Sequence, residues 1–203
     1  MALPSAVLPN PALAGADCPQ KGALANPAPE NGLGWMSLQG RWARLMAAGD
    51  KTVEWRKSAP SALDGGLFVL WESAPGAQAL ALARASKIWR APWPDLFARF
   101  AEQGVASAEE LSAYYGDKPQ ALAIEVQLVE RFERPIPWRL IKPLAGGFSP
   151  GPAPRWLSGE QAETVWAALG AAQALDAEEA LRDPNPAREP EAPRQKARGP
   201  WRA

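Results

Sequence analysis

Half of the 22 prolines in this 203-residue chain lie in its two ends, and they limit where a packed core can form. Six prolines fall within residues 1–33 and five within residues 183–203. Proline lacks the backbone N–H that helices and sheets require, and small or charged side chains bury little apolar surface. We therefore expect a disordered leader over residues 1–33 and a disordered, charged tail over residues 183–203. Between them we expect one domain over residues 34–157 and a helical extension over residues 158–182.

The lack of histidine and the single cysteine exclude several kinds of site. Without histidine the chain has no imidazole general base and no histidine-ligated zinc. Cys18 has no second cysteine with which to form a disulfide or a Cys-x-x-Cys site, which is typical of a protein in a reducing compartment. We therefore expect neither a metal site nor a cofactor.

Hydropathy and charge narrow the choice of partners. No stretch approaches eighteen consecutive apolar residues, and the first twenty residues lack the lysine or arginine of a secretory signal. We expect a cytoplasmic protein with no membrane partner. The 22 Lys and Arg balance the 22 Asp and Glu, but residues 34–157 carry a net charge of +3. This small excess predicts local rather than global contact with nucleic acid.

The order of apolar patterns predicts a mixed α+β fold. We expect strands over 51–57, 67–72, 77–89 and 121–132, and helices over 40–48, 94–100 and 107–116. Pro135 and Pro137 should then force an irregular edge. This order indicates a small mixed sheet in a partly closed β-barrel whose ends are filled by short helices.

The extension over residues 158–182 follows helical spacing. Its apolar residues Val165, Trp166 and Leu169 lie on one face, and they should dock the helix on the core.

The segment Gly49–Lys57, GDKTVEWRK, carries the best candidates for a site. On a strand that starts near Lys51, Glu54 and Arg56 share one face. Glu54 can accept hydrogen bonds, Arg56 offers a bidentate fork and Lys51 adds a mobile charge, so the cluster suits a polar ring or a phosphate. The alternative is a ladder of salt bridges on a solvated sheet face, which spacing alone favours.

This segment is similar to the G-x-K-x-x-E-x-R motif of the ASCH domain, a branch of the PUA-like superfamily of small β-barrels. Further segments resemble that family in the same order along residues 34–157. They are LFVLWESAP after the motif, Glu109-Glu110-Leu111, Tyr114-Tyr115-Gly116, Ala123-Ile124-Glu125-Val126, Phe132-Glu133-Arg134-Pro135 and PAPRWL near Pro154.

The resemblance implies a PUA-like barrel with a cleft between barrel and helices, and Lys51, Glu54 and Arg56 on its wall. Family members have been proposed as RNA-binding or transcription-coupled modules. The partner that the resemblance implies is therefore RNA or a nucleotide-like ligand.

A few ASCH proteins look like enzymes, either amidohydrolases of N4-acetylcytidine or ribonucleases. In those amidohydrolases the position three after the lysine is a threonine that could act as nucleophile, whereas this chain has Glu54. The neighbouring Thr52 should point to the opposite face of the strand. A metal-independent hydrolase would instead use Lys51 as base or nucleophile, or Glu54 as general base, with Glu102 as a further carboxylate. Because these residues make no complete catalytic set, we expect binding rather than catalysis.

Aromatic residues extend the candidate ligand site. Trp89 and Trp93 flank a presumed loop and are candidates for stacking on a base, although most tryptophans should be core residues. Tyr114 ends a predicted helix near the cleft, and Lys57 follows the motif. The expected ligand-binding residues are therefore Lys51, Glu54, Arg56, Lys57, Trp89, Trp93 and Tyr114.

Three hypotheses follow from the sequence. The first is an RNA- or nucleotide-binding module in RNA metabolism or transcription-coupled regulation, and the second is a hydrolase acting on RNA or a modified nucleoside. In the third, the proline-rich ends bind protein partners. The basic residues from Arg194 to Arg202 could add attraction to phosphate or form a solvated tail.

Overall fold

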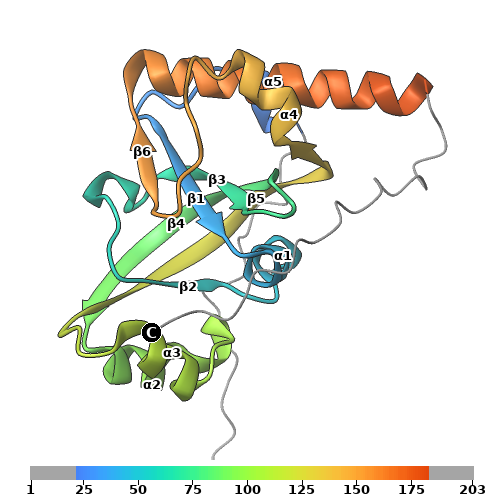
Figure 1. Cartoon of the computed structure of the whole chain (residues 1–203). Coiled ribbons are helices and arrows are strands. Elements are labelled where there is room, and N and C mark those ends of the chain that lie inside the picture. The colour runs from blue at the N-terminus through green and yellow to red at the C-terminus, as the bar shows by residue number, and fades with distance from the viewer. Residues whose placement is uncertain (1–21, 183–203) are drawn as a thin grey trace, which may run out of the picture.

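The computed structural model describes residues 22–182, which form an α+β fold around one curled sheet (Figure 1). The strands are β1 (Leu33–Leu38), β2 (Val53–Arg56), β3 (Leu67–Glu72), β4 (Gln78–Ala91), β5 (Ala121–Pro137) and β6 (Arg155–Leu157). The α-helices are α1 (Gly40–Ala48), α2 (Trp93–Gly104), α3 (Ala108–Tyr115), α4 (Trp138–Ile141) and α5 (Gly159–Arg182). Short 3-10 turns are η2 (Ala23–Ala25), η3 (Ser61–Leu63) and η4 (Lys142–Leu144).

The sheet curls into a half-barrel with the strand order β2-β5-β4-β3-β1-β6. The β1–β3 pair is parallel and the other pairs are antiparallel. Strands β4 and β5 form a long ribbon, whose pairing shifts register at three places. Such bulges increase the local twist and bend of a ribbon. The curvature brings the edge strand β2 near β1, and this is where the candidate site forms.

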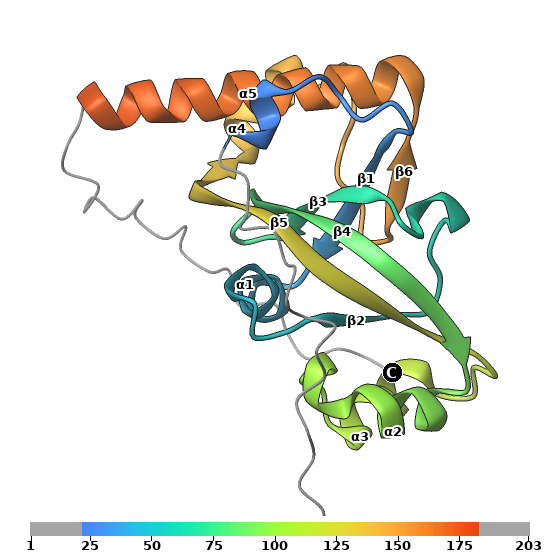
Figure 2. The ribbon, with the colours of Figure 1, turned by 180° about the vertical axis from the view of Figure 1, so that it is seen from behind.

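Three apolar clusters fix the helices on this sheet. The first lies inside the half-barrel and includes Met36, Phe68 and Ile124, with Met46 of α1 packed against them. A second cluster buries the face of α5, and a third lies under α2 and α3. Figures 1 and 2 show α5 along one end of the molecule, while α2 and α3 cover the opposite end. Within residues 22–182, no helix is both long enough and apolar enough to cross a membrane.

The C-terminal helix docks as the sequence predicts. Val165, Trp166 and Leu169 of α5 are buried in the second cluster, together with Leu24 of η2. The expected position of this helix is therefore confirmed. Because α5 lies at the end of the molecule away from α2 and α3, it contributes no residue to the cavity described below.

The packed chain begins earlier than expected. The expectation of a disordered leader fails for residues 22–33, because Leu24 is buried and the first strand already starts at Leu33. The carboxylate of Glu130 accepts hydrogen bonds from the backbone N–H groups of Gly22 and Ala23 at 3.0 and 2.8 Å. Nε1 of Trp166 also donates to the carbonyl of Asn26 at 2.9 Å, so several contacts fix this segment of low hydrophobicity. The remaining leader with Cys18, and the basic tail, lie outside the described residues.

Of two local expectations, one was wrong and one was confirmed. Trp89 lies inside β4 and Trp93 begins α2, so the presumed loop between them is only the junction of a strand and a helix. The irregularity expected at Pro135 and Pro137 is confirmed, because the pairing of β5 with β4 passes from Arg131 directly to Ile136. Strand β5 nevertheless continues through both prolines. This is possible because β2 pairs only with Leu122–Glu125, and the later part of β5 has a free edge where an N–H is not needed.

Candidate ligand-binding cavity

The glycine of the motif sets the direction of the chain at the site. Gly49 ends α1 with a φ of 86°, a left-handed conformation that favours glycine. Its N–H donates to the carbonyl of Met46 at 3.1 Å, and the N–H of Asp50 donates to the carbonyl of Leu45 at 2.9 Å. This tight helix end turns the chain at once into β2. As a result, Lys51 enters the molecule instead of pointing to solvent.

Lys51 is buried, with an exposed fraction of 2%. Its ammonium group donates to the carbonyl oxygens of Val53 and of Gly104, the latter at 2.9 Å, and lies 3.3 Å from Oε2 of Glu54. Gly104 is the last residue of α2, where the helix dipole favours a cation. Burial lowers the pKa of Lys51 from its ordinary value of 10.5, and the Glu54 carboxylate opposes this shift. All three N–H bonds of the ammonium thus have an acceptor.

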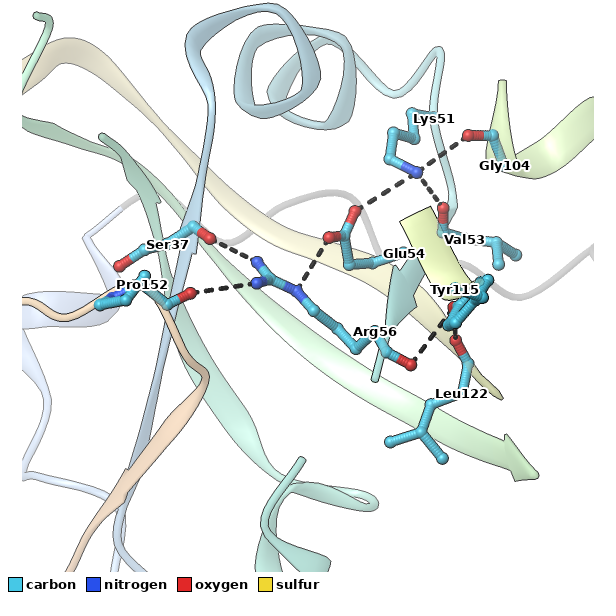
Figure 3. A network of polar contacts seen from close by, with 9 residues as sticks. All are labelled: Ser37, Lys51, Val53, Glu54, Arg56, Gly104, Tyr115, Leu122 and Pro152. Carbon is cyan, nitrogen blue, oxygen red and sulfur yellow. Dashed lines mark hydrogen bonds and ion pairs between the residues drawn. The ribbon is translucent and has the colours of Figure 1, made fainter. Parts of the chain in front are cut away.

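Glu54 connects the two cations of the motif. Its Oε1 lies 2.9 Å from Nε of Arg56, while its Oε2 faces Lys51 (Figure 3). Glu54 and Arg56 share one face of β2, as their spacing predicts. A solvated ladder of salt bridges, the alternative, is excluded because Lys51 and Glu54 are 2% and 7% exposed.

Arg56 joins three segments of the chain. Besides pairing with Glu54, its guanidinium donates to the carbonyl of Ser37 at the end of β1 and to the carbonyl of Pro152 at 3.2 Å. Figure 3 shows the guanidinium between these partners. Two of its five N–H donors make these hydrogen bonds, while Nε faces Glu54 in the ion pair without a hydrogen bond. Donor capacity therefore remains for a ligand. The carboxylate of Glu54 likewise retains acceptor capacity.

Tyr115, the last residue of α3, contacts the backbone of β2 and of β5 next to the site. Its buried hydroxyl lies 3.2 Å from the carbonyl oxygens of Arg56 and of Leu122, and its proton can serve either acceptor. Burial raises the pKa of this hydroxyl above its ordinary value of 10.0. Tyr115 thereby links the end of α3 to the pair formed by β2 and β5.

These groups border a cavity of about 490 Å³, within the usual size range of small-ligand sites. It lies between β1, α1, β2 and the α2–α3 region. The lining residues are Ser37, Leu38, Gln39, Trp42, Lys51, Glu54, Trp55, Arg56, Ser73, Gly104, Ala106, Glu110, Leu111, Tyr114 and Pro152.

Two aromatic side chains from opposite segments border this cavity, and each makes a cation–π contact with a basic side chain. Trp42 comes from α1, and the guanidinium carbon of Arg41 lies 4.4 Å from the centroid of its ring. Tyr114 comes from α3, is 40% exposed, and has Nζ of Lys57 at 4.7 Å from its ring centroid. The cavity therefore combines aromatic surface, buried charges and cations beside its lining.

The structure brings together part of the predicted set. Lys51, Glu54, Arg56 and Tyr114 line the cavity, and Lys57 lies beside it through its contact with Tyr114. Trp89 and Trp93 do not line it, because both pack against the third apolar cluster under α2.

The other residues considered for hydrolysis are also elsewhere. Glu102 and Thr52 are exposed and are not lining residues. Glu110 does line the cavity, but its carboxylate accepts from the N–H of Ser107 at 2.9 Å in a capping box. Within residues 22–182, no group of three acidic or cysteine side chains is close enough to hold a metal ion.

Sequence reasoning missed several lining residues. The helical pattern of residues 40–48 includes Trp42 but does not indicate that it lines a cavity. No motif in the sequence indicates a binding role for Gly104 or Pro152. Gly104 is needed because an added Cβ would lie 2.2 Å from Nε1 of Trp55. The only hint for Trp42 was a large aromatic in a short helix directly before the motif.

Solved structures provide the comparison for this fold. A crystal structure of ASCH from Zymomonas mobilis matches with a TM-score of 0.61 and 21% sequence identity, covering 66% of this chain and 94% of that chain. The chain has the fold of an ASCH domain. Two single-residue variants of the Zymomonas mobilis protein, each 22% identical, match with TM-scores of 0.60 and 0.59. No protein-family model matches the sequence, and no curated protein does.

The ASCH fold confirms the expectation drawn from the motif and from the order of the downstream segments. The curled half-barrel is part of this shared fold.

Proposed function

We propose that the cavity binds one nucleotide unit of a single-stranded RNA. The observation that carries this proposal is the cavity of about 490 Å³ in which charged Lys51, Glu54 and Arg56 meet aromatic Trp42 and Tyr114. Aromatic side chains stack on the faces of unpaired bases, and hydrogen bonds read their edges.

The hydrogen-bonding capacity left at the site supports a base as ligand. Arg56 retains donors and Glu54 retains acceptor positions after their mutual contact at 2.9 Å. A neighbouring donor and acceptor match the edge of a nucleobase, where such groups also alternate. Beside the lining, Arg41 and Lys57 supply positive charge for the phosphates of the strand.

The geometry of Lys51 favours binding over hydrolysis. A nucleophilic amine must lose a proton and expose its lone pair, but the three N–H bonds of Lys51 all point at protein acceptors. The lowered pKa of Lys51 is the observation that keeps hydrolysis as the second candidate.

The test compares matched variants in binding to a labelled single-stranded RNA of about 12 nucleotides. Tyr114→Ala removes an exposed aromatic that lines the cavity, and Leu144→Ala removes a similarly exposed apolar side chain elsewhere, at 40% and 43% exposure. We expect Tyr114→Ala to weaken binding about tenfold, because stacking on one base contributes about 1–3 kcal/mol. Leu144→Ala should bind like the wild type.

Nucleoside products are measured in the same samples, with RNA that contains N4-acetylcytidine. Equal binding of both variants would contradict the proposal. Products that disappear in Lys51→Met would replace it with the hydrolase.

A further inference from the structure

A second cationic feature lies outside the cavity, where Lys87 and Arg99 both contact the ring of Trp89. Nζ of Lys87 lies 4.1 Å and Cζ of Arg99 lies 3.9 Å from the centroid of that ring. Lys87 and Trp89 are two residues apart on β4 and share a face, while Arg99 comes from α2. We call these three residues the Trp89 clamp.

The ring of Trp89 is held in place from two sides. Its Nε1 donates to Oε1 of Glu125 on β5 at 2.5 Å, and its centroid lies 5.9 Å from that of Phe100 in the third cluster. A fixed ring limits the positions of the two cations that rest on it. The charged groups are thus held in place before any ligand arrives, which reduces the entropy lost on binding.

The clamp carries two cations and one neighbouring carboxylate, that of Glu125, which lies opposite Lys87 on β5. Within residues 22–182 no carboxylate forms an ion pair with Lys87 or Arg99, and both side chains are exposed. The carboxylate of Glu125 accepts from the neutral indole of Trp89, so the two cations of the clamp exceed its one carboxylate by one charge, and Asp64 accepts from the N–H of Ile88 at 2.9 Å. Contact with a ring face uses none of the N–H donors of a cation, so these remain available to an anion.

We infer that the Trp89 clamp binds phosphate groups of the same RNA strand, as a second contact outside the cavity. The choice of RNA as the partner rests on the proposed function. The lack of an ion pair at Lys87 and Arg99 in the described part of the chain is observed independently of that function. Trp89 and the cavity residue Trp55 both pair with Ala123, from opposite sides. Two strand spacings, about 10 Å, therefore separate their backbones. A mononucleotide in the cavity would not reach the clamp, whereas a longer strand would.

The experiment measures the salt dependence of binding in a double variant, Lys87→Gln with Arg99→Gln. Its control is Arg139→Gln with Lys142→Gln, which removes the same charge from α4 and η4 at the other end of the molecule. The probes are an RNA of about 12 nucleotides and a mixture of nucleoside monophosphates, titrated between about 50 and 200 mM salt.

Loss of two phosphate contacts should make the negative slope of log K against log salt less steep by about 1.4. It should also weaken binding of the longer RNA about tenfold. The control should retain the slope, and both double variants should bind the monophosphates like the wild type. Equal slopes in the clamp variant and the control would overturn the inference.

The two proposals fail in different ways. If Tyr114→Ala weakens binding and the clamp variant does not, the clamp is excluded while the cavity function stands. If the clamp variant alone lowers the slope and Tyr114→Ala has no effect, the clamp is supported and the cavity function fails. A wild-type protein that binds no RNA overturns both.

Discussion

The guanidinium of Arg56 donates a hydrogen bond to the carbonyl oxygen of Ser37, and this contact joins the two sides of the half-barrel. Arg56 belongs to β2, which is one edge of the sheet, whereas Ser37 belongs to β1, next to the other edge. Among the strands of residues 22–182, no hydrogen-bonded pair connects these two sides directly. One side chain of the motif therefore helps to close the structure on which the cavity depends.

Replacing Arg56 should destabilise the protein as well as alter the cavity. Arg56→Ala removes the contacts to Ser37 and Pro152 and leaves Glu54 with one cation in a buried position. We expect the free energy of unfolding to fall by about 3 kcal/mol, the usual cost of removing one partner of a buried ion pair. Urea denaturation measures this change.

The control for that change is Arg41→Ala. Arg41 is exposed, and its nitrogen lies 3.8 Å from a carboxylate oxygen of Glu110. Such exposed pairs contribute less than about 1 kcal/mol. If both variants lose the same small amount, Arg56 does not close the half-barrel.

Lys51 should make stability rise with pH in the alkaline range. Because burial lowers its pKa in the folded protein, the unfolded chain retains a proton that the folded chain releases between the lowered value and 10.5. Rising pH then favours the folded state. We expect the unfolding free energy of the wild type, relative to Lys51→Met, to increase as the pH rises from the lowered pKa of Lys51 toward 10.5.

The measurement stops below pH 10, because Tyr115 has the opposite effect on stability. Its raised pKa stabilises the folded protein below the ordinary value of 10.0, and this contribution is lost as the pH rises above that value. A relative stability that stays flat or falls would show that Lys51 has no lowered pKa.

The adjacent tyrosines should differ in their effects on stability. Tyr115→Phe leaves the buried carbonyls of Arg56 and Leu122 without their hydroxyl donor, and we expect a loss of about 1 kcal/mol. Tyr114→Phe changes an exposed ring that lines the cavity, so the free energy of unfolding should stay within about 0.5 kcal/mol of the wild type. Chemical denaturation of both variants tests the assignment, which an equal loss would contradict.

Gly104 should not tolerate a side chain. An added Cβ would lie 2.2 Å from Nε1 of Trp55, whose ring is buried, and relief of this overlap would move either the end of α2 or the tryptophan. Gly104→Ala should cost about 2 kcal/mol in thermal unfolding, which outweighs the roughly 1 kcal/mol that alanine gains in a helix. Gly151→Ala, where an added Cβ meets no atom within 4 Å, is the matched control. Equal melting temperatures would show that Trp55 can move freely.

The local signals in the sequence predicted most of the elements. Helical spacing placed the helix before Gly49, and the pattern from Lys51 to Arg56 placed Glu54 and Arg56 on one face of a strand, as their 2.9 Å contact confirms. These patterns depend on residues close together in the chain, so a single sequence contains them. The same reasoning failed for Trp89 and Trp93, where a charged and proline-containing junction resembled a loop.

The local pattern of residues 49–57 identifies the charged motif and places it where a helix turns into a strand. The burial of Lys51 and Glu54 follows from long-range packing, as does the position of Trp89 on another surface. The same packing adds Trp42, Gly104 and Pro152 to the cavity. The physical reason is that the cavity exists only after the sheet curls and its two sides meet. That closure depends on contacts such as Arg56 with Ser37 and with Pro152, 19 and 96 residues apart, which no local pattern encodes.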